Sequence, residues 1–118
     1  MKCLLDGEAY DWKDTSFHED HIFPASEFGV RGLRKLGYDN QKIQRYLSRF
    51  NTVLNLELLT DTENLSKNST PFSKWIAGRD DGFKRRHLIP ELDSYDLNAF
   101  EDFAEARKQL LVKRFKAI

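Results

Sequence analysis

The chain has 118 residues, of which 40% are hydrophobic and 13% aromatic, and its formal net charge at pH 7 is zero. This composition fits one globular domain with a modest core, and it excludes a uniformly basic nucleic-acid-binding protein. We expect no membrane association, because no apolar run reaches the length of a membrane span. A single cysteine, Cys3, excludes an intramolecular disulfide and a zinc knuckle, so we expect a reducing, cytoplasmic location.

The charges are unevenly distributed along the chain. Residues 1–30 hold two basic residues against seven acidic ones, whereas residues 31–50 hold six against one and residues 71–90 hold five against two. An acidic metal site flanked by basic segments that bind phosphates would produce this distribution. A mixed, well-solvated surface would produce it too, and the charge pattern alone favours that interpretation.

The first predicted element is a strand from Ser16 to Phe23, which carries the sequence HEDHIFP at residues 18–24. Pro24 is expected to end it, because proline cannot donate a hydrogen bond to a sheet. Two histidines and two carboxylates within four residues combine a group that can accept a proton near neutral pH with a ligand for a divalent cation. The sequence therefore indicates that residues 18–21 form the catalytic strand of a small metal-dependent nuclease.

A basic segment follows this strand. Residues 31–37 predict one helical turn that Gly37 stops, and Asp39 or Asn40 can cap the next helix. Apolar residues recur at helical spacing at positions 43, 46, 47 and 50. Arg45 and Arg49 lie off this apolar face, where they can contact solvent or a phosphate.

The second strand is predicted from Val53 to Leu59, and Thr60 or Asp61 then caps a short helix that carries Asn64 and Lys67. A further helix starts at residues 70–71, where proline favours the first helical position. Residues 79–82 predict a turn and precede a basic run at residues 84–86.

The last predicted element is a long helix that Ser94 or Asp96 opens. Its apolar residues follow one face, at positions 97, 100, 103, 104, 110, 111, 115 and 118. Acidic residues crowd its first turns and basic residues its end, a polarity that the helix dipole explains without a functional role. The predicted fold class is α+β, with a two-stranded antiparallel hairpin, several surrounding helices and a long C-terminal helix.

Two stretches resemble the HNH, or ββα-metal (His-Me finger), endonucleases. HEDHIFPASEF at residues 18–28 resembles their first motif, and NLELLTDTENLSKNSTPF at residues 55–72 resembles their second, with Asn64 nine positions after Asn55. The HNH domain of CRISPR RNA-guided nucleases is the most similar variant in having asparagine as its last ligand. The HIFP form and the tail from residue 85 also resemble the C-terminal nuclease domain of GmrSD-type modification-dependent restriction and phage-defence proteins.

The resemblance implies a metal-dependent DNA endonuclease or nickase. His21 would be the general base, Asp20 and Asn64 would bind one Mg²⁺ or Mn²⁺, and Asn55 would steady the loop that carries His21. Lys67 would add a positive charge near the scissile phosphate, as both a catalytic and a DNA-contacting residue. The other residues predicted to contact DNA are Arg45, Arg49, Lys74, Lys84, Arg85 and Arg86.

Residues 1–118 would form a single nuclease domain, with a core at about residues 15–80 and a helical extension at about 83–118. We see no module that would select the DNA, and therefore expect this domain to belong to a larger restriction or defence protein with other domains or subunits.

Three alternatives stay open at this point. A catalytically silent domain of the same fold could bind nucleic acid or a partner protein. His18 could face the metal site together with Asp20, because residues two apart share a strand face, but a hydrogen-bonded structural role fits it slightly better. The basic run at residues 84–86 also fits a solvated surface.

Overall fold

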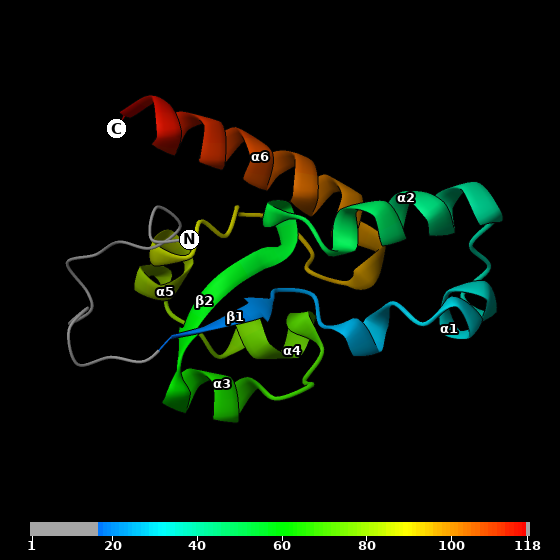
Figure 1. The fold of residues 1–118 in the computed structure, drawn as a ribbon, viewed down its shortest axis with the longest axis horizontal. Helices are drawn as coiled ribbons and strands as arrows, with labels where there is room; N and C mark the ends of the chain where they lie inside the picture. The colour runs from blue at the N-terminus through cyan, green and yellow to red at the C-terminus, as the bar shows by residue number, and fades with distance from the viewer. Residues whose placement is uncertain (1–16, 118) are drawn as a thin grey trace.

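The computed structural model describes residues 17–117. Two strands, β1 (Phe17–His21) and β2 (Leu56–Thr60), pair antiparallel. Figure 1 shows the long helix α6 on one side of this sheet and α3 and α4 on the other. The helices are α1 (Val30–Lys35), α2 (Asn40–Phe50), α3 (Asp61–Lys67), α4 (Phe72–Ala77), α5 (Asp81–Arg86) and α6 (Phe100–Ala117), with short 3-10 helices η3 (Ala25–Glu27), η4 (Val53–Asn55) and η5 (Leu97–Ala99).

The predicted fold class is confirmed at the level of a mixed α+β domain with an antiparallel strand pair, several helices and a long C-terminal helix. Residues 1–16 and 118, which include Cys3, Ser16 and Ile118 of the sequence predictions, lie outside the described residues. Among the helices of residues 17–117, none combines the length and apolar character that crossing a membrane requires.

Local capping residues set where two of the helices begin. The Asp39 side chain accepts a hydrogen bond from the backbone N–H of Lys42 at 2.8 Å and caps α2, as predicted. Thr60 caps α3 in a reciprocal capping box with Glu63, whose carboxylate accepts from the Thr60 backbone N–H at 2.9 Å. The start of α3 is therefore fixed relative to the end of β2.

We expect Thr60→Ala to lower the free energy of unfolding by about 1 kcal/mol, because it removes the hydroxyl that accepts from the Glu63 backbone N–H. Urea unfolding measures this change. Thr62→Ala, an exposed substitution within the same helix, is the matched control and should leave stability within about 0.5 kcal/mol of the wild type. Equal effects of the two substitutions would contradict the role of Thr60 as the cap.

Several sequence predictions of local structure are wrong. The first strand ends at His21, two residues before the predicted Phe23. The last helix begins at Phe100, after η5, rather than at residue 94 or 96.

The predicted turn at residues 79–82 is the start of α5, where the Asp80 side chain accepts from the Phe83 N–H at 2.8 Å. The same residue types favour turns and helix N-caps, which explains the confusion. The second strand begins at Leu56 rather than at Val53, because residues 53–55 form η4.

The core gathers aromatic side chains from distant segments. The ring of Phe23, in the loop after β1, lies 4.7 Å from that of Phe72 in α4 and 5.0–5.2 Å from those of Phe103 and Phe100 in α6, centroid to centroid. Burial and ring contacts both favour this packing. The first half of α6 thus packs on the segment that follows β1, whereas Phe115 near its end is 48% exposed, so the apolar face predicted for this helix is buried only in part.

Candidate functional site

The two faces of β1 carry different polar side chains. Because successive strand residues point to opposite faces, His18 and Asp20 share one face and His21 lies on the other. His18 pairs with Asp61 at the start of α3, and Asp20 pairs with Lys67 at the end of the same helix. The structure therefore brings Asp20 together with α3, while the His21 side chain lies against the end of α2.

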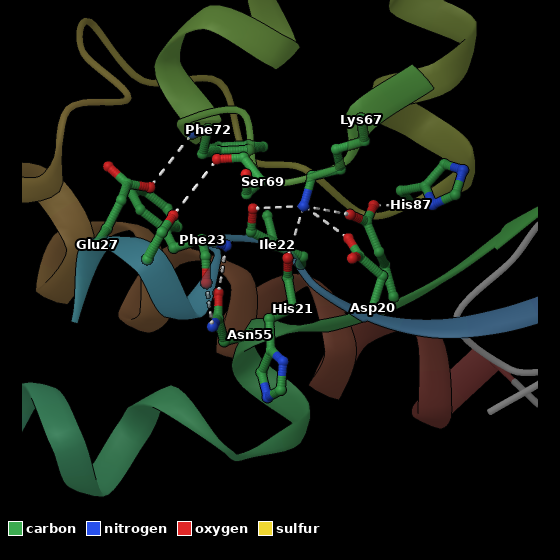
Figure 2. Close-up of polar contacts among 12 residues, drawn as sticks. Asp20, His21, Ile22, Phe23, Glu27, Asn55, Lys67, Ser69, Phe72 and His87 are labelled. Carbon is green, nitrogen blue, oxygen red and sulfur yellow. Dashed lines mark hydrogen bonds and ion pairs between the residues drawn. The ribbon is translucent and has the colours of Figure 1, made fainter. Parts of the chain in front are cut away.

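Lys67 is fully buried and holds the end of β1 (Figure 2). Its ammonium donates to Asp20 Oδ2 at 2.6 Å, to the carbonyl oxygen of His21 at 2.6 Å and to that of Ile22 at 3.0 Å. A fourth oxygen, Glu57 Oε2, lies 3.7 Å away. Since this burial removes the ammonium from solvent, it favours a positioning role for Lys67 over the direct phosphate contact predicted from the sequence.

Asp20 and Glu57 are directly opposite each other in the sheet and have unequal affinities for a proton. Burial raises the pKa of Asp20 to about 6; Glu57 adds to the rise and Lys67 opposes it. Burial also acts to raise the pKa of Glu57, but contacts with His87 and Lys67 outweigh it and hold that pKa below its usual value. Of this pair, Glu57 therefore holds its negative charge more firmly.

His87 supports Glu57 from the end of α5. This fully buried histidine places Nδ1 3.2 Å from Glu57 Oε1, and its ring stacks on Phe83 with centroids 4.0 Å apart. The carbonyl oxygen of His87 accepts a hydrogen bond from Arg107 of α6 at 3.1 Å. Buried polar contacts thus run from Arg107 of α6 to His87, from His87 to Glu57 of β2, and from Glu57 through Lys67 to Asp20.

The His21 ring is partly exposed and held from two sides. It stacks on Phe50 with centroids 4.2 Å apart and planes 11° from parallel, and its Nε2 lies 2.9 Å from Asn51 Oδ1. An amide oxygen only accepts, so with the Asn51 amide in this orientation Nε2 carries the hydrogen. The lone pair that can take a proton is then on Nδ1.

Asn55 connects the loop that follows His21 to the end of α2. This fully buried side chain accepts from the Phe23 N–H at 2.8 Å and donates to the carbonyl oxygens of Phe23 and Phe50, both at 3.0 Å. Its own backbone carbonyl accepts from Ile22 at 2.8 Å. Asn55 therefore holds the loop that follows His21 against the residue on which the His21 ring stacks.

The predicted metal ligands offer oxygen donors of the right chemistry. Lys67 engages Oδ2 of Asp20, and among the described residues the partly exposed Asn64 amide makes no side-chain hydrogen bond. One carboxylate and one amide oxygen, completed by water, suit Mg²⁺, which keeps several waters when bound to proteins. Within residues 17–117 no group of three or more His, Cys, Asp or Glu is arranged to hold a metal ion.

Several of the basic residues predicted to contact DNA are engaged within the protein. Arg45 makes two hydrogen bonds to the Glu101 carboxylate of α6, at 2.9 and 3.2 Å, and Arg49 donates to the Arg45 carbonyl at 3.4 Å. Lys84 lies 3.9 Å from Glu91. Lys74 and Arg85 are exposed, and Arg86 is partly exposed.

Helix α1 presents a basic face that is not among the residues predicted to contact DNA. Its three cations, Arg31, Arg34 and Lys35, are exposed and form no ion pair with a residue of the described part. The signal for this face was already present in the basic run at residues 31–35. These side chains are free to contact an anionic partner.

Sequence reasoning also missed Arg107, which is fully buried. Its guanidinium donates to the carbonyl oxygens of Val53, His87 and Leu88, at 2.6, 3.1 and 3.2 Å. A signal existed, because Arg107 stands at helical spacing between the buried residues Ala104 and Leu111 of α6.

No protein-family model matches the chain, and no curated protein matches it either.

Proposed function

We propose that the protein is a metal-dependent DNA endonuclease or nickase in which β1, β2 and α3 form a ββα-metal (HNH) core. The observation that carries the proposal is the hydrogen bonding of Asn55, which stands just before β2 and ties the loop after His21 to the end of α2. The order of elements supports it too: Asp20 and His21 end the first strand, and Asn64 lies on the helix directly after the second strand.

His21 would act as the general base in this proposal. Its partly exposed ring has Nδ1 available to take a proton from water, while Nε2 stays on Asn51. The stack on Phe50 and the bond to Asn51 restrict rotation of the ring, so the basic nitrogen is held in one direction.

Asp20 and Asn64 would hold the single divalent cation. When bound, such an ion stabilises the negative charge that builds on the phosphate and on the leaving oxygen. With a pKa of about 6, the Asp20 carboxyl is mostly ionised at pH 8 and can offer its oxygen there.

Exposed cations would supply the contacts to the DNA backbone. Arg31, Arg34 and Lys35 of α1, together with Lys74 and Arg85, are all exposed. Such contacts give affinity without sequence preference. The setting in restriction or phage defence, and the other domains or subunits that would select the DNA, enter this proposal through the sequence resemblance alone.

A catalytically silent binding module of the same fold is the second candidate. Two observations favour it: Lys67 already occupies one oxygen of Asp20, and the His21 side chain lies on the opposite face of β1 from that carboxylate. Such a module would keep the exposed basic side chains for binding nucleic acid or a partner protein.

Plasmid nicking in the presence of Mg²⁺ separates the two candidates. We expect the wild type to nick supercoiled DNA and His21→Ala to reduce the rate by at least about a hundredfold, as loss of a general base does. His18→Ala is the matched control, since it removes an exposed histidine of the same strand, and we expect it to retain most of the activity. Equal cleavage by wild type and His21→Ala would remove His21 from the mechanism. DNA binding without cleavage by the wild type would favour the silent module.

A further inference from the structure

The ammonium of Lys67 sits in an environment that resembles a binding site for a monovalent cation. Two carboxylates and two backbone carbonyls surround it, at 2.6 to 3.7 Å, and the side chain is fully buried. Oxygen donors of this kind are also the ligands of metal ions in proteins. Lys67 therefore does for Asp20 and Glu57 what a bound cation would do: it compensates their charge and satisfies the carbonyls beside them.

The same helix carries the second predicted metal ligand. Asn64 and Lys67 are three positions apart on α3, which places them on one side of the helix. Lys67 uses Oδ2 of Asp20, so a divalent cation bound by Asp20 and Asn64 would share its carboxylate with the ammonium. Like charges that share one carboxylate repel each other, and the repulsion is strong where little water intervenes.

We propose that Lys67 is a tethered internal cation that competes with a divalent cation for the Asp20 carboxylate. The inference rests on the proposed function, in which Asp20 is a metal ligand. Lys67 stabilises the end of β1 in the metal-free protein and, by the same contact, lowers the affinity of the site for metal.

Competition and simple structural support predict opposite results when Lys67 loses its charge. If Lys67 only supports the fold, its replacement loosens the end of β1 and weakens metal binding. If it competes, its replacement strengthens metal binding while the protein itself becomes less stable. The sign of the change in metal affinity therefore decides between the two roles.

Calorimetric titration with Mn²⁺ at pH 8 is the test. Lys67→Gln removes the charge but keeps an amide that can donate to the carbonyls of His21 and Ile22. We expect it to bind Mn²⁺ at least about tenfold more tightly than the wild type. Lys108→Gln removes an exposed lysine of α6 and should leave the affinity unchanged. Adding Asp20→Asn to Lys67→Gln should abolish the gain.

The other outcomes show whether the competition fails, the proposed metal site fails, or both fail. A folded Lys67→Gln variant whose Mn²⁺ affinity is unchanged or weaker overturns the competition; if Asp20→Asn nevertheless weakens binding by the wild type, the metal site of the proposed function survives. If neither the wild type nor any variant binds Mn²⁺, both the inference and that metal site are overturned. Binding by Lys67→Gln alone, dependent on Asp20, would support the competition in its strongest form.

If Lys67→Gln does not fold without metal, thermal unfolding over a range of Mn²⁺ concentrations still tests the inference. Competition predicts that the unfolding temperature of Lys67→Gln rises more steeply with Mn²⁺ concentration than that of the wild type, because tighter binding stabilises the folded state more. An equal or smaller rise overturns the inference.

Discussion

Replacement of Arg107 by methionine is expected to lower the free energy of unfolding by about 4 kcal/mol. The guanidinium donates to the carbonyl oxygens of Val53, His87 and Leu88, and methionine offers none of these hydrogens. Each carbonyl left without a donor in the interior costs about 1–3 kcal/mol. Burial lowers the pKa of Arg107 to about 10, so the side chain stays protonated at neutral pH.

The loss would be a large share of the stability of a small domain, which is typically about 5–15 kcal/mol. Urea unfolding measures it. Arg114→Met is the matched control, because Arg114 lies on the same helix, is only partly buried and makes no hydrogen bond with a residue of the described part. We expect that control to stay within about 1 kcal/mol of the wild type. An equally small effect of Arg107→Met would show that the three bonds contribute no net stability.

Asn55→Asp is expected to destabilise the protein by about 3 kcal/mol at pH 8. The change keeps the size of the side chain but replaces an amide that donates to the carbonyls of Phe23 and Phe50 with a carboxylate that cannot donate. Its negative charge would then be buried against two carbonyl oxygens. The loop after His21 would lose its attachment to the end of α2, so we also expect nuclease activity to fall.

The destabilisation by Asn55→Asp should depend on pH, with a defined sign. Burial and the two carbonyls favour the neutral form, so the pKa of the introduced carboxyl is raised in the folded state. The folded state then binds more protons than the unfolded state, and stability rises as pH falls through that raised pKa.

Thermal unfolding at pH 5 and pH 8 checks this sign against Asn68→Asp, an exposed control that should show little pH dependence. A variant more stable at pH 8 than at pH 5, relative to wild type, would contradict the buried-amide role.

Sequence patterns predicted the helix caps of α2 and α3, whose deciding contacts join residues three positions apart. In each case the structure selects one of the two predicted candidates, Asp39 for α2 and Thr60 for α3. The cap of α5 is equally local but was predicted as a turn, because the same residue types favour both.

The predicted start of β2 was wrong because residues 53–55 form η4, in which the Asn55 N–H donates to the Thr52 carbonyl at 2.9 Å. The bonds of the Asn55 side chain to Phe23, 32 residues away, are a contact that no local pattern reports. The same limit applies to Arg45, whose partner Glu101 lies 56 residues away.

Buried charges were the main feature that sequence patterns did not predict. Lys67 was expected near a phosphate, and for Arg107 no role was predicted; both are fully buried. A lysine or arginine is usually exposed, so its type alone argues for the surface. Burial becomes favourable only when oxygens from remote segments converge on it, as they do from β1 onto Lys67.

The order of strand, strand and helix and the caps of α2 and α3 could be predicted from sequence patterns, because they depend on neighbours within a few positions. The pairing of Asp20 with Lys67, the stack of His21 on Phe50 and the hold of Asn55 on the loop after His21 could not be predicted, and appeared only in the folded domain. The physical reason is that hydrogen bonds and ion pairs of buried groups are formed between segments far apart in the chain, and their partners exist only once the core has packed.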